Sequence, residues 1–197
     1  MEIFTTNKKT KKALITFSGL DGSGKSTFVN RLKSEKSDFK VIHIVNFRLI
    51  NKVFKSSKSE KKIKNYNSQV FLIGLVNLIL MFFDILIFRL YFFISNKSFI
   101  CDRYFYDLLA VHEYKYGHSF MINFIKFFIK KPSFPFYIDV NYKQAQKREV
   151  GDDHDEFYFK CTKKNYDRMI NDGIFYVIKN LEVEKSFLDI LKKINAK

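Results

Sequence analysis

Tryptophan is absent from this chain of 197 residues, which also has only two cysteines, two prolines and seven glycines. Cys101 and Cys161 stand far apart in a lysine-rich sequence. This excludes a disulfide-stapled scaffold and a cysteine-based zinc site, and it fits a reducing compartment. Residues 1–12 are polar and basic and contain no apolar segment of the length that a signal peptide requires. We therefore expect a cytoplasmic protein.

Acidic residues are also scarce, with 20 against 35 basic residues and a net charge of +15. Such a surplus is typical of proteins that bind nucleic acid, anionic membranes or phosphorylated substrates. The basic residues are 29 lysines and 6 arginines, and they are scattered rather than gathered with aromatic residues into a nucleic-acid platform. We expect no specific nucleic-acid partner, and the AT-rich codons of lysine, asparagine, isoleucine and phenylalanine are a competing explanation for part of the charge.

Short apolar segments alternate along the chain with longer segments of helical spacing, and no internal repeat is visible. Strands are predicted at residues 13–18, 41–45, 98–101, 134–140 and 173–178. Helices are predicted at residues 26–33, 66–94, 104–116, 120–131, 142–171 with a break near 151–153, and 181–194. Strands that alternate with helices predict an α/β fold, a five-stranded parallel sheet covered on both faces and formed by a single domain of residues 1–197.

The longest apolar segment, Val70–Ile94, has the length of a membrane-spanning helix but not its composition. Asp84 and Arg89 interrupt it, and a charge at the centre of a bilayer costs at least about 2.5–3.5 kcal/mol. We therefore predict a buried core helix, with membrane contact at most peripheral. An exposed patch on residues 70–83 would equally suit a homodimer interface.

Residues 19–26 read GLDGSGKS, with two glycines, a lysine and a serine at the spacing of a phosphate-binding loop. Gly22 and Gly24 let the backbone turn so that its N–H groups face a polyphosphate. Lys25 reaches the β- and γ-phosphates, and the hydroxyl of Ser26 can bind Mg²⁺. The loop follows a predicted strand and opens a predicted helix, whose positive end adds to the anion site. ATP and Mg²⁺ are therefore the expected cofactors.

Three acidic or basic residues accompany the loop. Asp21 lies within it, where a carboxylate beside a triphosphate needs a partner such as a substrate hydroxyl, a basic residue or the metal. Asp102 and Arg103 follow the third predicted strand, at the edge where ligands bind in open α/β sheets. Asp102 is a candidate for holding Mg²⁺ and Arg103 for clamping a second phosphate. Lys25 itself is expected at a solvent-facing end of the loop.

The sequence GLDGSGKST followed by CDRY at residues 101–104 resembles the thymidylate kinase family. The resemblance continues through FPFYIDV at residues 134–140, which is similar to that family's fourth strand, and through residues 142–166, which are similar to its lid helix and the next helix. DRYFYDLL and Lys147-Arg148-Glu149 look more like the divergent thymidylate-kinase-like proteins of bacterial surface-polysaccharide gene sets. The resemblance implies a P-loop NTPase fold, a three-layer α/β/α sandwich.

The same resemblance implies ATP- and Mg²⁺-dependent phosphoryl transfer to a nucleoside monophosphate, with dTMP as the first acceptor. It implies a metal site at Ser26 and Asp102, and catalytic roles for Lys25, Asp102, Arg103 and Arg148. The implied ATP-binding residues are Gly19, Asp21, Gly22, Ser23, Gly24, Lys25, Ser26 and Thr27, with Lys147 and Arg148 from a lid of about residues 142–160. The implied acceptor-binding residues are Asp21, Arg48, Phe82, Phe83, Arg103 and Tyr104.

Two departures from the family pattern concern the acceptor. The family's Arg-Glu-Pro-Gly-Gly segment is replaced by Asn46–Leu49, and in the base-reading pattern Phe-x-x-Asp-Arg the arginine is replaced by Ile85. These departures predict a relaxed acceptor preference. They leave open a P-loop kinase that acts on another small phosphate or alcohol. They also leave open a nucleotide-binding module with little turnover, which would work with a membrane or protein partner through the basic segment 52–64 and the apolar segment 70–94.

Overall fold

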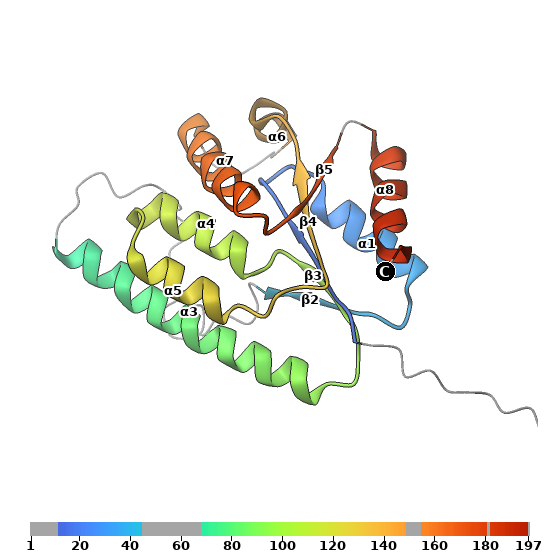
Figure 1. The fold of residues 1–197 in the computed structure, drawn as a ribbon. Coiled ribbons are helices and arrows are strands. Elements are labelled where there is room, and N and C mark those ends of the chain that lie inside the picture. The colour runs from blue at the N-terminus through green and yellow to red at the C-terminus, as the bar shows by residue number, and fades with distance from the viewer. Residues whose placement is uncertain (1–11, 45–67, 149–154, 181, 197) are drawn as a thin grey trace, which may run out of the picture.

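The computed structural model describes residues 12–44, 68–148, 155–180 and 182–196. Its five strands form one sheet in the order β2-β3-β1-β4-β5, and every neighbouring pair is parallel (Figure 1). The strands are β1 (Leu14–Ser18), β2 (Lys40–His43), β3 (Phe99–Asp102), β4 (Phe134–Asp139) and β5 (Tyr176–Lys179). The predicted five-stranded parallel sheet is thereby confirmed.

Seven described helices cover the sheet and complete three layers (Figure 1). On one face lie α1 (Lys25–Glu35) and α8 (Val183–Asn195). On the other face lie α3 (Ser68–Ile94), α4 (Phe105–Tyr116), α5 (Phe120–Phe128) and α7 (Glu156–Asn171). The short α6 (Tyr142–Arg148) follows β4 and stands beyond the carboxyl end of that strand.

Alternation of side chains along β1 divides the interior into two cores. Leu14 contributes to the core beneath α3, α4, α5 and α7, whereas Ile15 and Phe17 contribute to the core beneath α1 and α8. All three side chains are essentially inaccessible to water. Because successive side chains of a strand point to opposite faces, a short strand of almost continuous apolar residues can serve both layers at once.

Two predicted boundaries are wrong by several residues. The helix predicted at 120–131 ends at Phe128, because Ile129 adopts an extended conformation and is buried in the core rather than continuing the turn. The strand predicted at 173–178 begins at Tyr176, because Gly173 takes a positive φ of 71° at the end of α7. Proline and glycine in the sequence thus indicated that an element ends or begins nearby, but not the residue at which it does so.

The long helix α3 buries only one of its faces. Leu78, Met81 and Ile85 point into the core, and the carboxylate-bearing Asp84 is buried with them. Residues on the opposite face, from Phe71 to Ile94, remain exposed. The segment Val70–Ile94 is long and apolar enough to cross a membrane by length and composition, a test that core helices also pass. The predicted buried core helix is therefore correct for one face of α3 and wrong for the other.

The carboxylate of Asp107 connects three elements inside the protein. It accepts hydrogen bonds from the hydroxyl of Ser18 (2.6 Å) and the backbone N–H of Gly19 (3.2 Å) at the end of β1. It also accepts from the backbone N–H of Tyr104 (2.7 Å) at the start of α4, and from the hydroxyl of Tyr166 (2.7 Å) on α7. Since Asp107 is only 1% exposed, these donors replace the water that a carboxylate would otherwise bind.

We predict that Asp107→Ala lowers the free energy of unfolding by about 3 kcal/mol or more, because several buried donors lose their charged acceptor together. Urea denaturation measures the change. The matched control is Asp189→Ala, which removes an exposed carboxylate of α8 that lies 4.0 Å from Lys192. A loss below about 1 kcal/mol for Asp107→Ala would contradict the connecting role of this residue.

Candidate active site

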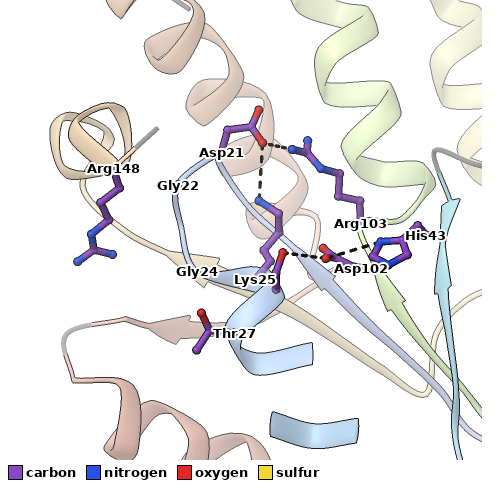
Figure 2. A pocket seen from close by; sticks show the side chains of 10 residues that line it. Asp21, Gly22, Gly24, Lys25, Thr27, His43, Asp102, Arg103 and Arg148 are labelled. Atoms are coloured by element: carbon purple, nitrogen blue, oxygen red, sulfur yellow. Dashed lines mark hydrogen bonds and ion pairs between the residues drawn. The ribbon is translucent and has the colours of Figure 1, made fainter. Parts of the chain in front are cut away.

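A cavity of about 680 Å³ lies at the carboxyl ends of β1, β2 and β3 (Figure 2). Four separate parts of the chain meet around it: the predicted phosphate loop, the end of β2, the end of β3 and the end of α6. The lining residues are Asp21, Gly22, Gly24, Lys25, Ser26, Thr27, His43, Asp102, Arg103 and Arg148. In parallel sheets this edge is the usual place for a ligand, and the cavity contains most of the residues predicted for the site.

The backbone of the loop depends on two glycines. Gly24 has a φ of 91° and caps α1, so the helix begins at Lys25 with its positive end at the cavity. Gly22 has a φ of 74°, and a Cβ at this position would lie 2.2 Å from the carbonyl oxygen of Ala145 on α6. Asn180 donates a hydrogen bond of 2.8 Å to the carbonyl of Ser23. The loop is therefore held from both sides, with α6 in direct contact.

The side chain of Lys25 is buried rather than solvent-facing, which corrects the expectation from sequence. Its Nζ donates to the carbonyl oxygens of Gly19 (3.0 Å) and Leu20 (2.7 Å), and it lies 4.0 Å from a carboxylate oxygen of Asp21. Burial and the positive charge of Arg103 lower the pKa of Lys25, against the opposing effect of Asp21. The loop thus folds around its own ammonium group and keeps it beside the cavity.

Asp21 forms an ion pair with Arg103 (Figure 2), and Tyr158 of α7 contacts the same carboxylate. The guanidinium of Arg103 donates to one carboxylate oxygen, and the hydroxyl of Tyr158 donates to the other at 2.9 Å. Burial alone would raise the pKa of Asp21, but the charges of Arg103 and Lys25 together with these hydrogen bonds lower it below 3.8. The sequence predicted that Asp21 needs a partner such as a substrate hydroxyl, a basic residue or the metal. In the structure this partner is a basic residue, Arg103.

Ser26 and Asp102 lie together at the start of α1 and the end of β3. The hydroxyl of Ser26 donates to Oδ2 of Asp102 at 2.9 Å, and Nδ1 of His43 lies 3.8 Å from the same oxygen. Within the described residues no three His, Cys, Asp or Glu side chains gather as metal ligands. A hydroxyl and a single carboxylate suit Mg²⁺, which keeps several waters and binds to phosphates rather than to an all-protein cage. The residues predicted for the metal therefore fit it.

His43 was not predicted from the sequence. It is the last residue of β2 and pairs in register with Asp102 of β3, which brings its ring to the cavity. The prediction of a parallel sheet could have indicated His43, since the carboxyl ends of adjacent strands share one edge of the sheet. The order of the strands, however, was not known from the sequence.

The predicted aromatic acceptor residues do not line the cavity. Phe82 packs against Phe124 and Phe128 of α5, with ring centroids 6.2 and 5.1 Å away, and Phe83 faces outward on α3. Tyr104 is fully buried, and its hydroxyl donates to the carbonyl of Lys130. The resemblance implies acceptor contacts for Phe82, Phe83 and Tyr104, whereas in the structure Phe82 and Tyr104 are packing residues.

Of the basic residues assigned to the lid and to the acceptor, some line the cavity and others do not. Arg148 ends α6 and lines the cavity, on the opposite side of the loop from Arg103 (Figure 2). Lys147 is exposed on α6 and is not among the lining residues. Arg48 lies outside the described residues. Two arginines therefore approach the cavity from different elements, which places positive charge on both sides of the phosphate loop.

The sheet order, the loop that opens α1 and the cavity together define a P-loop nucleotide-kinase fold, and solved structures agree. The chain is similar to thymidylate kinase from Ehrlichia chaffeensis at 20% identity and a TM-score of 0.61, over 93% of this chain and 98% of that one. It is similar to thymidylate kinase from Candida albicans at 17% identity and a TM-score of 0.63, over 94% and 92%. It is also similar to deoxyadenosine kinase from M. mycoides with bound dATP at 18% identity and a TM-score of 0.61, over 93% and 99%.

No protein-family model and no curated protein matches the sequence. Identities of this size show the fold alone, and the predicted thymidylate-kinase-like fold is confirmed. The more particular resemblance, to proteins of bacterial surface-polysaccharide gene sets, stays a prediction.

We predict that ionised Asp21 stabilises the fold, and that its contribution disappears in acid. Because the pKa is lowered in the folded protein, the contribution is complete above 3.8 and is lost as pH falls through the lowered value. Asp21→Asn cannot titrate. We expect it to be less stable than the parent by about 2 kcal/mol at about pH 6, with the difference narrowing towards about pH 3. Urea denaturation at a series of pH values measures this, and a difference that does not change with pH would contradict it.

Proposed function

We propose that this protein transfers a phosphoryl group from ATP to a nucleoside monophosphate in the presence of Mg²⁺, with dTMP as the first acceptor. The observation that carries the proposal is the cavity shared by the phosphate loop, the Ser26–Asp102 pair and Arg103. A polyphosphate needs cradling N–H groups, an ammonium and oxygen ligands for its metal. These groups meet at one edge of the sheet.

The donor half of the reaction uses the loop. Lys25 carries three N–H donors on a flexible chain, so it can exchange the carbonyls of Gly19 and Leu20 for phosphate oxygens without leaving the loop. Ser26 and Asp102 would hold Mg²⁺, which neutralises charge on the β- and γ-phosphates when bound. Arg148 faces the same cavity from α6 and supplies further positive charge. These residues orient the phosphoryl group and stabilise charge as it develops.

The acceptor half would use Arg103 and Asp21. A guanidinium has five N–H donors, and the bond to Asp21 leaves others for a phosphate. Arg103 has a φ of 65°, an uncommon conformation for a residue other than glycine, directly after β3. Its backbone N–H donates to the carbonyl of Phe17 on β1 at 3.1 Å. The sheet itself thus directs the arginine to the cavity.

A nucleoside, with a free hydroxyl in place of the phosphate, is a second candidate acceptor. Arg103 is already neutralised by Asp21, so an incoming phosphate meets a charge pair rather than a free cation. The carboxylates of Asp21 and Asp102 both line the cavity, and either could accept a hydroxyl proton. Similarity to deoxyadenosine kinase from M. mycoides supports this alternative, as similarity to the thymidylate kinases supports the first.

A panel of acceptors tests the proposal. With ATP and Mg²⁺ we expect turnover with dTMP that exceeds turnover with dUMP, dCMP or UMP by no more than about 10²-fold in kcat/KM. The reason is that Ile85 stands where the family pattern has an arginine, and a site without hydrogen bonds to the base discriminates weakly. Product chromatography measures each reaction. Deoxyadenosine in the same panel tests the second candidate, and a preference for it over every monophosphate would replace the first.

Arg103→Ala distinguishes the two acceptors, because a phosphate binds the guanidinium directly and a nucleoside hydroxyl does not. For dTMP we expect KM to rise about 10–100-fold while KM for ATP changes little. Arg31→Ala is the matched control, since Arg31 pairs with the exposed Glu184 on the far side of α1. ATP binding without turnover on any acceptor would contradict both candidates and favour a nucleotide-binding module.

A further inference from the structure

An exposed apolar face covers α3 and α5, away from the cavity. On α3 the exposed apolar residues of this face recur every three or four positions. The helix α5 lies beside α3, where Phe82 contacts Phe124, and extends the face. The face consists of Leu72, Val76, Ile79, Phe83, Leu86, Leu90 and Phe93 of α3 with Phe120, Phe124 and Phe127 of α5. Phe93, Phe120 and Phe127 are 79%, 81% and 82% exposed. Contiguous apolar surface of this kind marks an interaction site.

The charged groups around this face are almost all positive. From residue 68 to residue 131 every acidic side chain is buried, namely Asp84, Asp102, Asp107 and Glu113. The basic side chains of the same region that are exposed or half-exposed and lie outside the active-site cavity are Arg89, Lys97, Lys115, Lys126, Lys130 and Lys131. From another element, Asp172 lies 3.9 Å from Lys126. The exposed apolar face is therefore surrounded mainly by these basic side chains, which we call its basic border.

A second cavity, of about 710 Å³, lies at the carboxyl end of α3. Three cations line it together with apolar side chains of the face. Lys12 donates to the carbonyl of Phe93 at 2.8 Å, Arg89 donates to that of Phe128, and Nζ of Lys130 lies 5.4 Å from the ring of Phe92. The combination suits an amphiphile that has an anionic phosphate head and apolar chains.

We propose that this face binds the surface of an anionic phospholipid bilayer. Lipid phosphates contact Lys12, Arg89 and Lys130, while Phe93, Phe120 and Phe127 enter the interface to a shallow depth. The helix α3 lies on the bilayer rather than across it, because its other face is buried in the core. None of these residues lines the active-site cavity.

Charge favours a bilayer over a second copy of the chain. A symmetric dimer through this face would bring two basic borders together, in a protein whose net charge is +15. An anionic leaflet instead attracts the same border and receives the apolar side chains beneath it.

Sedimentation with vesicles tests the proposal on the full chain. We expect binding to phosphatidylcholine vesicles that contain about 30% phosphatidylglycerol, little binding to phosphatidylcholine alone, and release at about 0.5 M salt. Lys12→Ala/Lys130→Ala should weaken binding about fivefold for each charge removed. Lys185→Ala/Lys192→Ala is the matched control, since it removes two exposed lysines of α8 and should have a smaller effect.

Insertion is measured separately with a single tryptophan, because the chain contains none. Phe93→Trp should shift its emission to shorter wavelength with anionic vesicles. Leu188→Trp, at an exposed position of α8, should not. Equal binding to both vesicle types, or unchanged emission of Phe93→Trp, would overturn the proposal. So would a stable dimer in light scattering that becomes monomeric in Phe127→Ser and does not bind vesicles, because the face would then be a dimer interface.

Discussion

Two buried carboxylates hold the phosphate loop, and much of the molecule is organised around satisfying them. Asp107 takes donors from β1, α4 and α7, and Asp21 takes donors from Arg103 and from Tyr158 of α7. A buried carboxylate without such donors is strongly destabilising, so the loop can adopt this conformation only when the neighbouring elements are in place. The conformation of the loop therefore depends on the packing of the surrounding elements.

The loop also contacts α6 and α7, the two helices that follow β4. Ala145 of α6 leaves no space for a side chain at position 22, and Tyr158 connects the first turn of α7 to Asp21. Arg148 ends α6, so its charge is positioned by a helix in direct contact with the loop. The loop is therefore in direct contact with both α6 and α7.

Local patterns were enough to predict the loop, the parallel sheet and the Ser26–Asp102 pair, because each depends on residues close in sequence or on strand ends that must share an edge. His43 and Asp107 were missed, since their roles depend on strand order and on partners far along the chain. Lys25 was expected to face solvent, and this was wrong. Its ammonium group is buried against backbone carbonyls, which a sequence pattern does not display. The packing of Phe82 against Phe124 and Phe128 was also not visible in the sequence, since a helix gives no sign of which side chains a later helix will cover.

The central claim is that a nucleotide polyphosphate binds within residues 19–26. The seven glycines of the chain make this directly measurable by NMR of protein labelled with ¹⁵N at glycine only. On titration with a non-hydrolysable ATP analogue and Mg²⁺, the resonances of Gly19, Gly22 and Gly24 should shift in a saturable manner, while those of Gly117 and Gly173, which lie in other turns, should stay in place. Saturable binding that left the three loop resonances unmoved would contradict the account.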